Sequence, residues 1–96
     1  MSQQRYRYEF LSHVCFDEVE ASLALAISPT EAIHGESQVR LDFGYNLDAR
    51  ARTCVLDAGT PVGLDVNRLF VGIIRKQFGE DAFVVDRLTH PEEATA

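Results

Sequence analysis

The sequence predicts an α+β domain with the ferredoxin-like order β-α-β-β-α-β, in which a four-stranded antiparallel sheet carries two helices on one face. Two kinds of hydrophobic spacing indicate this order. Three short segments alternate with period two, a fourth short segment is rich in apolar residues, and two longer segments repeat with helical spacing. The 96 residues suit one hydrophobic core, so we expect a single domain over residues 5–88 with flexible ends over 1–4 and 89–96.

The first predicted strand runs from Arg5 to about Val14. One parity of this stretch is apolar and is expected in the core: Tyr6, Tyr8, Phe10, Val14 and Phe16. Asp17 with Glu20 three residues later forms a capping-box pattern, which predicts that a helix starts there.

The first predicted helix carries a buried stripe at Val19, Leu23 and Ile27. Pro29 then interrupts the pattern, because proline inside a helix removes a backbone hydrogen bond. We expect either a kink or a fresh short turn that ends near Gly35.

A β-hairpin is predicted next. The residues from Val39 to Tyr45 alternate, the residues from Asn46 to Arg50 are turn formers, and alternation resumes from Ala51 to Asp57. The second helix follows, with Thr60 as its cap and Pro61 in its first turn.

The second helix is expected to end at Gly79, a residue type that favours helix C-termini. Arg75 and Lys76 lie in its last turn, where positive charge suits the helix dipole. The segment from Ala82 to Leu88 is predicted to form the last strand.

The parity opposite the aromatic one is expected to line an open sheet face, and this face is the best functional surface that the sequence offers. Leu11 and Leu56 among its charged residues favour partial burial against another subunit. The candidate ligand or interface residues are Arg7, His13, Cys15, Arg40, Arg52 and Cys54. The simpler interpretation is a solvated face with cross-strand ion pairs between its arginines and carboxylates, such as Arg40 and Asp42.

The charge pattern argues against a nucleic-acid partner. The formal net charge is −6, and eight arginines with a single lysine provide the positive charge. The third strand lacks the basic, glycine and aromatic pattern with which sheets of this kind stack RNA bases. We therefore expect no nucleic-acid partner.

The sequence contains only incomplete sets of the residues that a metal site or a catalytic site requires. His13, Cys15 and Cys54 are possible zinc or copper ligands, but the chain has no CxxC motif, so we expect no metal and no cofactor. His34 and Ser37 together do not define the geometry of a hydrolytic triad. No catalytic residue is assigned, and whether the protein is an enzyme stays open.

The leading hypothesis is a small, acidic, non-catalytic domain that self-associates, as a homodimer, through its open sheet face or a sheet edge. No apolar leader or membrane span is visible and the two cysteines suit free thiols, so we expect a cytoplasmic protein without a membrane partner. The alternative is a small-molecule-binding protein or enzyme. Its pocket would lie at the sheet face or dimer interface, lined by Arg7, His13, Arg52 or Cys54.

Overall fold

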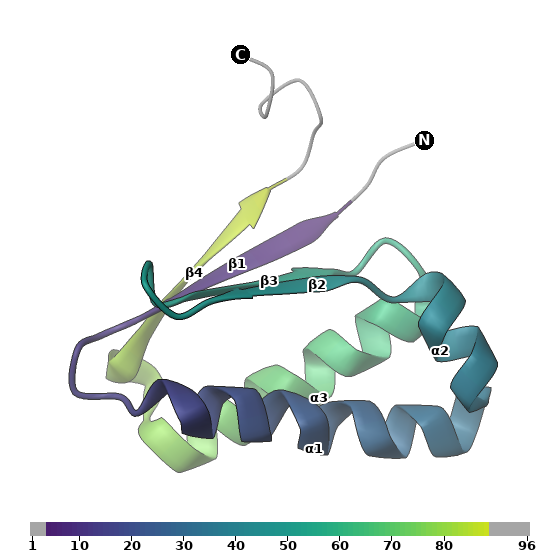
Figure 1. Ribbon diagram of the computed structural model, residues 1–96, viewed down its shortest axis with the longest axis horizontal. Helices are drawn as coiled ribbons and strands as arrows, with labels where there is room; N and C mark the ends of the chain where they lie inside the picture. The colour runs from purple at the N-terminus through teal and green to yellow at the C-terminus, as the bar shows by residue number, and fades with distance from the viewer. Residues whose placement is uncertain (1–3, 89–96) are drawn as a thin grey trace.

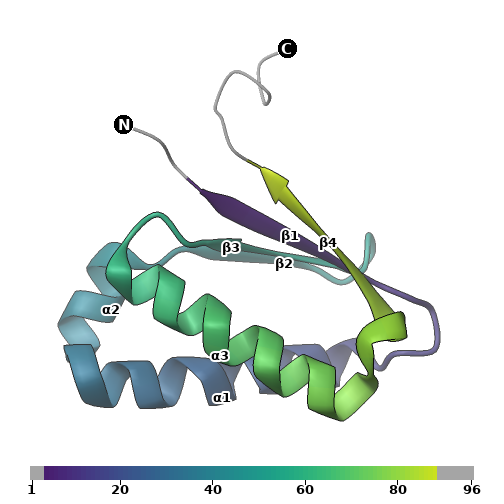
Figure 2. The ribbon, with the colours of Figure 1, turned by 180° about the vertical axis from the view of Figure 1, so that it is seen from behind.

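A computed structural model describes residues 4–88 as a four-stranded antiparallel sheet with all helices on one face (Figures 1 and 2). The strands are β1 (Arg5–Phe10), β2 (Tyr45–Asp48), β3 (Thr53–Asp57) and β4 (Phe83–Leu88), in the spatial order β2-β3-β1-β4. The helices are α1 (Phe16–His34), α2 (Glu36–Asp42), α3 (Pro61–Phe78) and a 3-10 turn at Glu80–Ala82. The expected flexible ends lie outside the described residues, except for Gln4.

The α+β class and the four-stranded antiparallel sheet are thus confirmed, whereas the expectation of two helices is wrong. The first and third strands are neighbours at the centre of the sheet, and β2 and β4 form its two edges. The start of β1 and the end of β4 extend beyond the helical layer (Figures 1 and 2). Tyr6, on the helix side of this end of β1, is therefore only partly buried against the core.

The core lies between the sheet and helices α1 and α3. Tyr8 and Phe10 of β1 are buried, as their parity predicted, and Tyr8 packs edge-to-face on Phe70 of α3 with ring centroids 5.1 Å apart. The hydroxyl of Tyr8 donates to the side-chain oxygen of Asn67, which is also buried. This hydrogen bond satisfies both polar groups inside the core.

Helix α1 begins one residue before the predicted cap. Cys15 is its N-cap residue and provides no side-chain hydrogen bond, so Asp17 lies within the first turn. Pro29 lies inside the helix, which continues to His34 instead of restarting. Gly35 ends it with φ of 91°, a left-handed conformation that favours glycine.

The predicted strand from Val39 to Tyr45 is wrong, because most of it forms helix α2. Only Val39 of α2 is buried, while Leu41 is 79% exposed, so its alternating apolar residues do not share one buried face. Local pairs at helical spacing stabilise α2: Arg40 donates to Glu36 at 3.2 Å and Gln38 to Asp42 at 2.5 Å.

The hairpin turn begins three residues later than expected and ends two residues later. Asn46 lies in β2, and the turn occupies residues 49–52 instead of 46–50. The β1 strand also ends earlier than predicted, at Phe10, so residues 11–15 form a loop. The β3 strand runs from Thr53 to Asp57, close to its predicted bounds.

Helix α3 matches its sequence signals. The hydroxyl of Thr60 accepts from the amide of Gly63 at 3.0 Å, Pro61 occupies the first turn, and Gly79 follows the last residue. Gly63 is required for close packing, because a Cβ atom there would lie 2.1 Å from the carbonyl oxygen of Asp57. The start of α3 therefore packs directly on the end of β3.

Candidate functional site

The open face of the sheet is defined by the strand pairing, since paired residues in antiparallel strands point to the same side. Each row across this face includes one residue of β1, namely Arg5, Arg7 or Glu9. Their partners on the neighbouring strands complete the face: Asn46, Asp48, Thr53, Val55, Asp57, Val84, Asp86 and Leu88. The face is therefore mostly polar and charged.

Arg7 is the only candidate residue that lies on this face. Its guanidinium lies 3.5 Å from the carboxylate of Glu9 and 3.8 Å from that of Asp86, and all three side chains are at least one-third exposed. Exposed pairs of this kind contribute little stability. Arg7 thus behaves as part of a solvated ion-pair network.

Cys54 and Leu56 lie in the core, so their expected placement on the open face is wrong. They pair with Tyr8 and Tyr6 in the β1–β3 register and share the helix-facing side with them. A shift by one residue reverses every side chain of a strand, and the predicted parity of β3 was off by that one residue. The open face is consequently less apolar than expected.

Burial changes the acidity of two core groups. The pKa of the Cys54 thiol rises to about 12 because burial disfavours the thiolate. Burial also raises the pKa of the Tyr8 phenol, with smaller contributions from Cys54 and Tyr6 and an opposing one from the bond to Asn67. Both groups are neutral core residues, so Cys54 is not available as a nucleophile or metal ligand.

Arg52 has a structural role that the sequence analysis missed. It lies in the turn before β3, with φ of 59°, and its guanidinium donates to the carbonyl oxygens of Phe10 at 3.3 Å and Leu11 at 2.9 Å, and to that of Val14. The side chain therefore links the β2–β3 turn to the loop that leads into α1. It does not line the open face.

The other candidates are dispersed. His13 and Cys15 are exposed in the loop before α1, and Arg40 pairs with Glu36 on α2. Asp42, expected beside Arg40 on the sheet, ends α2, where its carbonyl oxygen accepts from the Thr60 hydroxyl at 2.7 Å. The six candidates do not form a common site.

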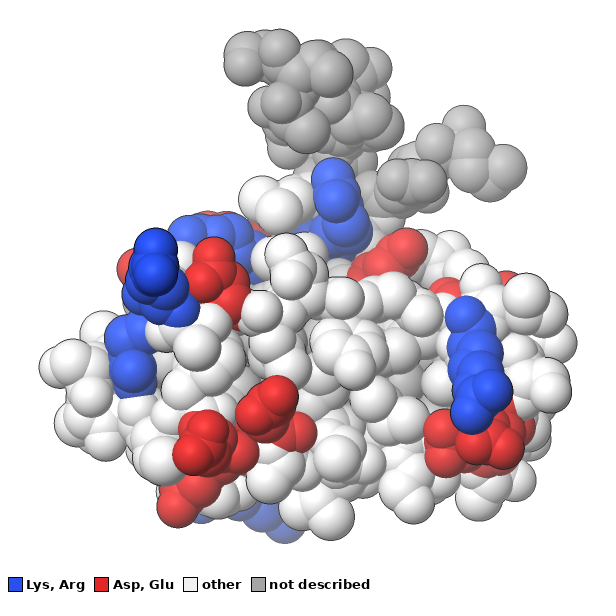
Figure 3. Space-filling view, in the orientation of Figure 1, with Lys and Arg blue, Asp and Glu red and all other residues white. Residues whose placement is uncertain are grey.

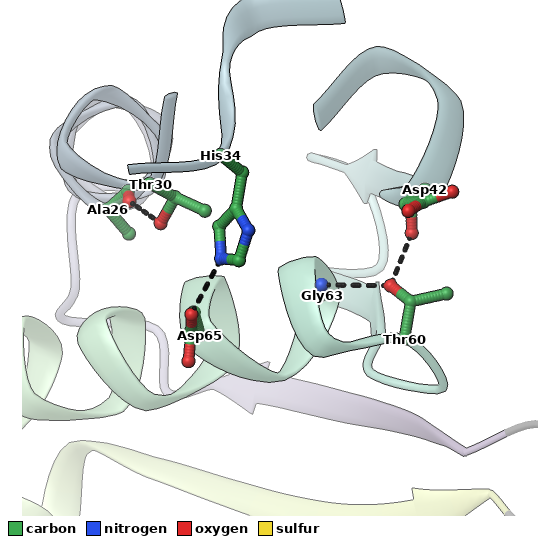
Figure 4. A network of polar contacts seen from close by, with 7 residues as sticks. All are labelled: Ala26, Thr30, His34, Asp42, Thr60, Gly63 and Asp65. Carbon is green, nitrogen blue, oxygen red and sulfur yellow. Dashed lines mark hydrogen bonds and ion pairs between the residues drawn. The ribbon is translucent and has the colours of Figure 1, made fainter. Parts of the chain in front are cut away.

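His34 takes part in a polar network between the helices (Figure 4). Its Nε2 atom lies 2.9 Å from a carboxylate oxygen of Asp65 on α3. The nearby hydroxyl of Thr30 donates to the carbonyl of Ala26, and Ser37 is exposed on α2. Within residues 4–88, no hydroxyl is hydrogen-bonded to this imidazole, so the pair joins α1 to α3 without an attached nucleophile.

Potential metal ligands do not cluster. Across the part of the chain that the structure describes, there is no group of three or more His, Cys, Asp or Glu side chains placed to hold a metal ion. His13 and Cys15 lie in a loop, whereas Cys54 lies in the core. The three possible zinc or copper ligands suggested by the sequence are therefore apart in the structure.

The outer edge of β4 is a surface that includes none of the candidate residues. The amide of Leu11 donates to Ala82 at 2.9 Å, and hydrogen-bonded pairs alternate along an antiparallel ladder. The backbone groups of Phe83, Val85 and Arg87 therefore point away from β1. Among the described residues no strand pairs with them, and the side chains of Val84 and Val85 are 54% and 41% exposed.

The segment from Ala82 to Leu88 was predicted to form a strand, but its position in the sheet was not predicted. Which strand occupies an edge depends on the order of the sheet, which the pattern within one strand does not contain.

Two hollows lie beside the opposite edge. One, of about 220 Å³, is on the open face and is lined by Arg5, Asn46, Val55 and Asp57 with Gly44 and Tyr45. The larger, of about 420 Å³, lies between α1 and β2. None of the six candidate residues lines either hollow.

Comparisons with known protein families, curated proteins and solved structures find no match to this chain. Among the described residues, no helix has both the length and the apolar character needed to span a membrane.

Proposed function

We propose that this protein is a non-catalytic, self-associating domain that forms a homodimer through the outer edge of β4. The exposed edge with Val84 and Val85 carries this proposal, because an apolar edge strand with free backbone groups is a template for pairing with another chain. The open face is a weaker candidate, because Cys54 and Leu56 are absent from it and ion pairs surround Arg7.

A two-fold axis perpendicular to the sheet would pair β4 with β4 of a second copy in antiparallel orientation. The register centred on Val85 places Val85 opposite its own counterpart and Phe83 opposite Arg87. It engages all the outward-pointing backbone groups of Phe83, Val85 and Arg87. A register centred on Asp86 would instead place two carboxylates directly opposite each other, which is unfavourable. The Val85 register is therefore the one that we propose.

The sheet order supports placing this domain in the ferredoxin-like class. Read from the other edge, the order is β4-β1-β3-β2, with α2 as an addition between α1 and β2. We retain the cytoplasm as its proposed compartment, supported by the two free cysteines.

Light scattering across a concentration series tests the dimer. The proposal predicts that the wild-type mass approaches twice that of the chain and that Val85→Lys restores the monomer, because two ammonium groups would face each other. Val84→Lys is the matched control: it adds the same charge on the other side of β4, opposite Asp86 of the second copy, and should remain dimeric. A wild-type monomer at all concentrations would contradict the proposal.

The hollow that includes Arg5 favours a second candidate function, the binding of a small ligand on the open face. Its volume of about 220 Å³ is smaller than the ~300 Å³ typical of the smallest ligand pockets. Titration with acetate and with inorganic phosphate, followed by NMR, tests this candidate. Shifts confined to the amides around Asn46 and Val55, and lost in Arg5→Ala, would support it; the absence of shifts would exclude these anions.

A further inference from the structure

The groove between α1 and β2 has an apolar floor and an acidic rim. Its volume is about 420 Å³, and Asp17 and Glu20 of α1 provide the rim. The remaining lining residues are mostly apolar: Ala21, Leu23, Ala24, Ile27, Tyr45 and Leu47. Figure 3 shows acidic side chains gathered over the start of α1 and a largely uncharged surface between that helix and β2.

The backbone of β2 is open along this groove. The amide of Asp57 donates to the carbonyl of Gly44 at 2.9 Å, so by alternation the residues that bond to β3 are Gly44, Asn46 and Asp48. The amide and carbonyl groups of Tyr45 and Leu47 therefore point away from the sheet. Both side chains also line the groove, so free backbone groups and an apolar floor occur at the same place.

The negative charge around the groove favours a basic ligand. Neither Lys nor Arg lines it, and the carboxylates of Asp17 and Glu20 form no ion pair with another residue in the range 4–88. A second copy of this chain would bring the same acidic rim and a net charge of −6. A basic segment of another protein is electrostatically complementary.

We propose that this groove binds an extended basic and apolar peptide segment, which joins the sheet as an additional antiparallel strand beside β2. Residues of the segment opposite Tyr45 and Leu47 point their apolar side chains into the groove, because paired residues share one face of a sheet. A flanking Lys or Arg of the segment contacts Asp17 and Glu20. This site lies at the edge opposite β4, and its existence does not depend on the dimer.

A synthetic peptide with the sequence Arg-Ser-Val-Ser-Ile-Ser, acetylated and amidated at its ends, is the first probe. Its Arg, Val and Ile share one face of an extended strand. NMR titration of the wild-type protein should shift and protect the amides of Tyr45 and Leu47. The same peptide with Glu in place of Arg should bind at least about fivefold more weakly, through loss of its contacts to the rim.

Two methylated probes separate strand addition from simple filling of the groove. N-methylation of Val and Ile removes the donors that would face β2, whereas N-methylation of the intervening Ser residues removes donors on the far side. The first probe should lose binding and the second should retain it. Equal affinities for the two would overturn the proposal.

A pair of protein variants tests the rim. Glu20→Lys reverses a rim charge and should weaken binding of the arginine peptide at least about fivefold. Glu18→Lys makes the same change two residues earlier in α1, outside the lining of the groove, and should leave the affinity within about twofold. The proposal is overturned if no peptide shifts Tyr45 and Leu47, or if the protein alone already protects these amides by pairing with a second copy.

Discussion

The guanidinium of Arg52 donates a 2.9 Å hydrogen bond to the carbonyl of Leu11, a residue 41 positions earlier in the chain. Together with its bonds to Phe10 and Val14, this contact joins the β2–β3 turn to the loop before α1. The loop carbonyls obtain a charged donor, and such hydrogen bonds are stronger than neutral ones.

Arg52→Ala is expected to lower the free energy of unfolding by about 2 kcal/mol, since it removes these charged donors. Arg52→Gly removes the same donors but relieves the positive φ of 59° at this position. The glycine variant should therefore be about 1 kcal/mol more stable than the alanine variant in urea denaturation. Equal stabilities for the wild type and the alanine variant would show that the hydrogen bonds of the Arg52 guanidinium contribute nothing to stability.

Two glycines of α3 should respond oppositely to alanine. Gly63→Ala is expected to destabilise the fold by about 3 kcal/mol, because its Cβ would lie 2.1 Å from the Asp57 carbonyl oxygen. At Gly72, an added Cβ has no neighbour within 4 Å, and alanine should stabilise the helix by about 0.5–1 kcal/mol. Thermal denaturation of both variants measures this contrast, which fails if Gly63→Ala is neutral.

The buried pair of Tyr8 and Asn67 should behave as a unit. Tyr8→Phe leaves the Asn67 oxygen without its donor and should cost about 1–3 kcal/mol. Adding Asn67→Leu removes the unsatisfied group, so the double variant should be more stable than the sum of the single changes predicts. A double-mutant cycle by chemical denaturation measures this coupling, and strict additivity would contradict it.

Alkaline pH should destabilise the protein through Cys54. Its pKa rises from the ordinary value of 9.0 to about 12 in the folded state, so the unfolded thiol loses its proton first. Stability from this group is complete below pH 9 and is lost as the pH rises toward 12. Tyr8, with its raised pKa, adds to the loss above its ordinary value of 10.0.

Denaturation of a Cys54→Ala variant between pH 8 and about 11 measures the contribution of the thiol. The variant should be less stable at pH 8, but its stability should decline less steeply as the pH rises. Cys15→Ala alters an exposed thiol and should keep the wild-type slope. An unchanged slope in the Cys54 variant would refute the assignment.

Local signals in the sequence predicted the structure correctly where a single residue determines a backbone feature. Thr60 and Pro61 start α3 and Gly79 follows it, because capping and proline geometry act within a single turn. The aromatic parity of β1 was also predicted correctly, since Tyr8 and Phe10 are large enough to require burial.

Competing local contacts and tertiary context decided the features that the sequence patterns did not predict. The alternation at Val39 and Leu41 indicated a strand, but pairs such as Glu36 with Arg40 favour the helix that forms. The parity of β3 was ambiguous, because Cys54 and Val55 are both acceptable core residues, and pairing with β1 selected Cys54. The residues of β3 that were predicted to lie on the open face therefore face the helices instead.

Cysteine cross-linking at β4 tests the proposed dimer most directly. In a Cys15→Ser background, Val85→Cys would face its counterpart with Cβ atoms about 5 Å apart, close enough for a disulfide after small adjustments. Val84→Cys would lie diagonally from its counterpart and beyond that reach. We predict a covalent dimer for Val85→Cys and none for Val84→Cys under mild oxidation. Failure of Val85→Cys to cross-link, or equal yields for both variants, would contradict the dimer through β4.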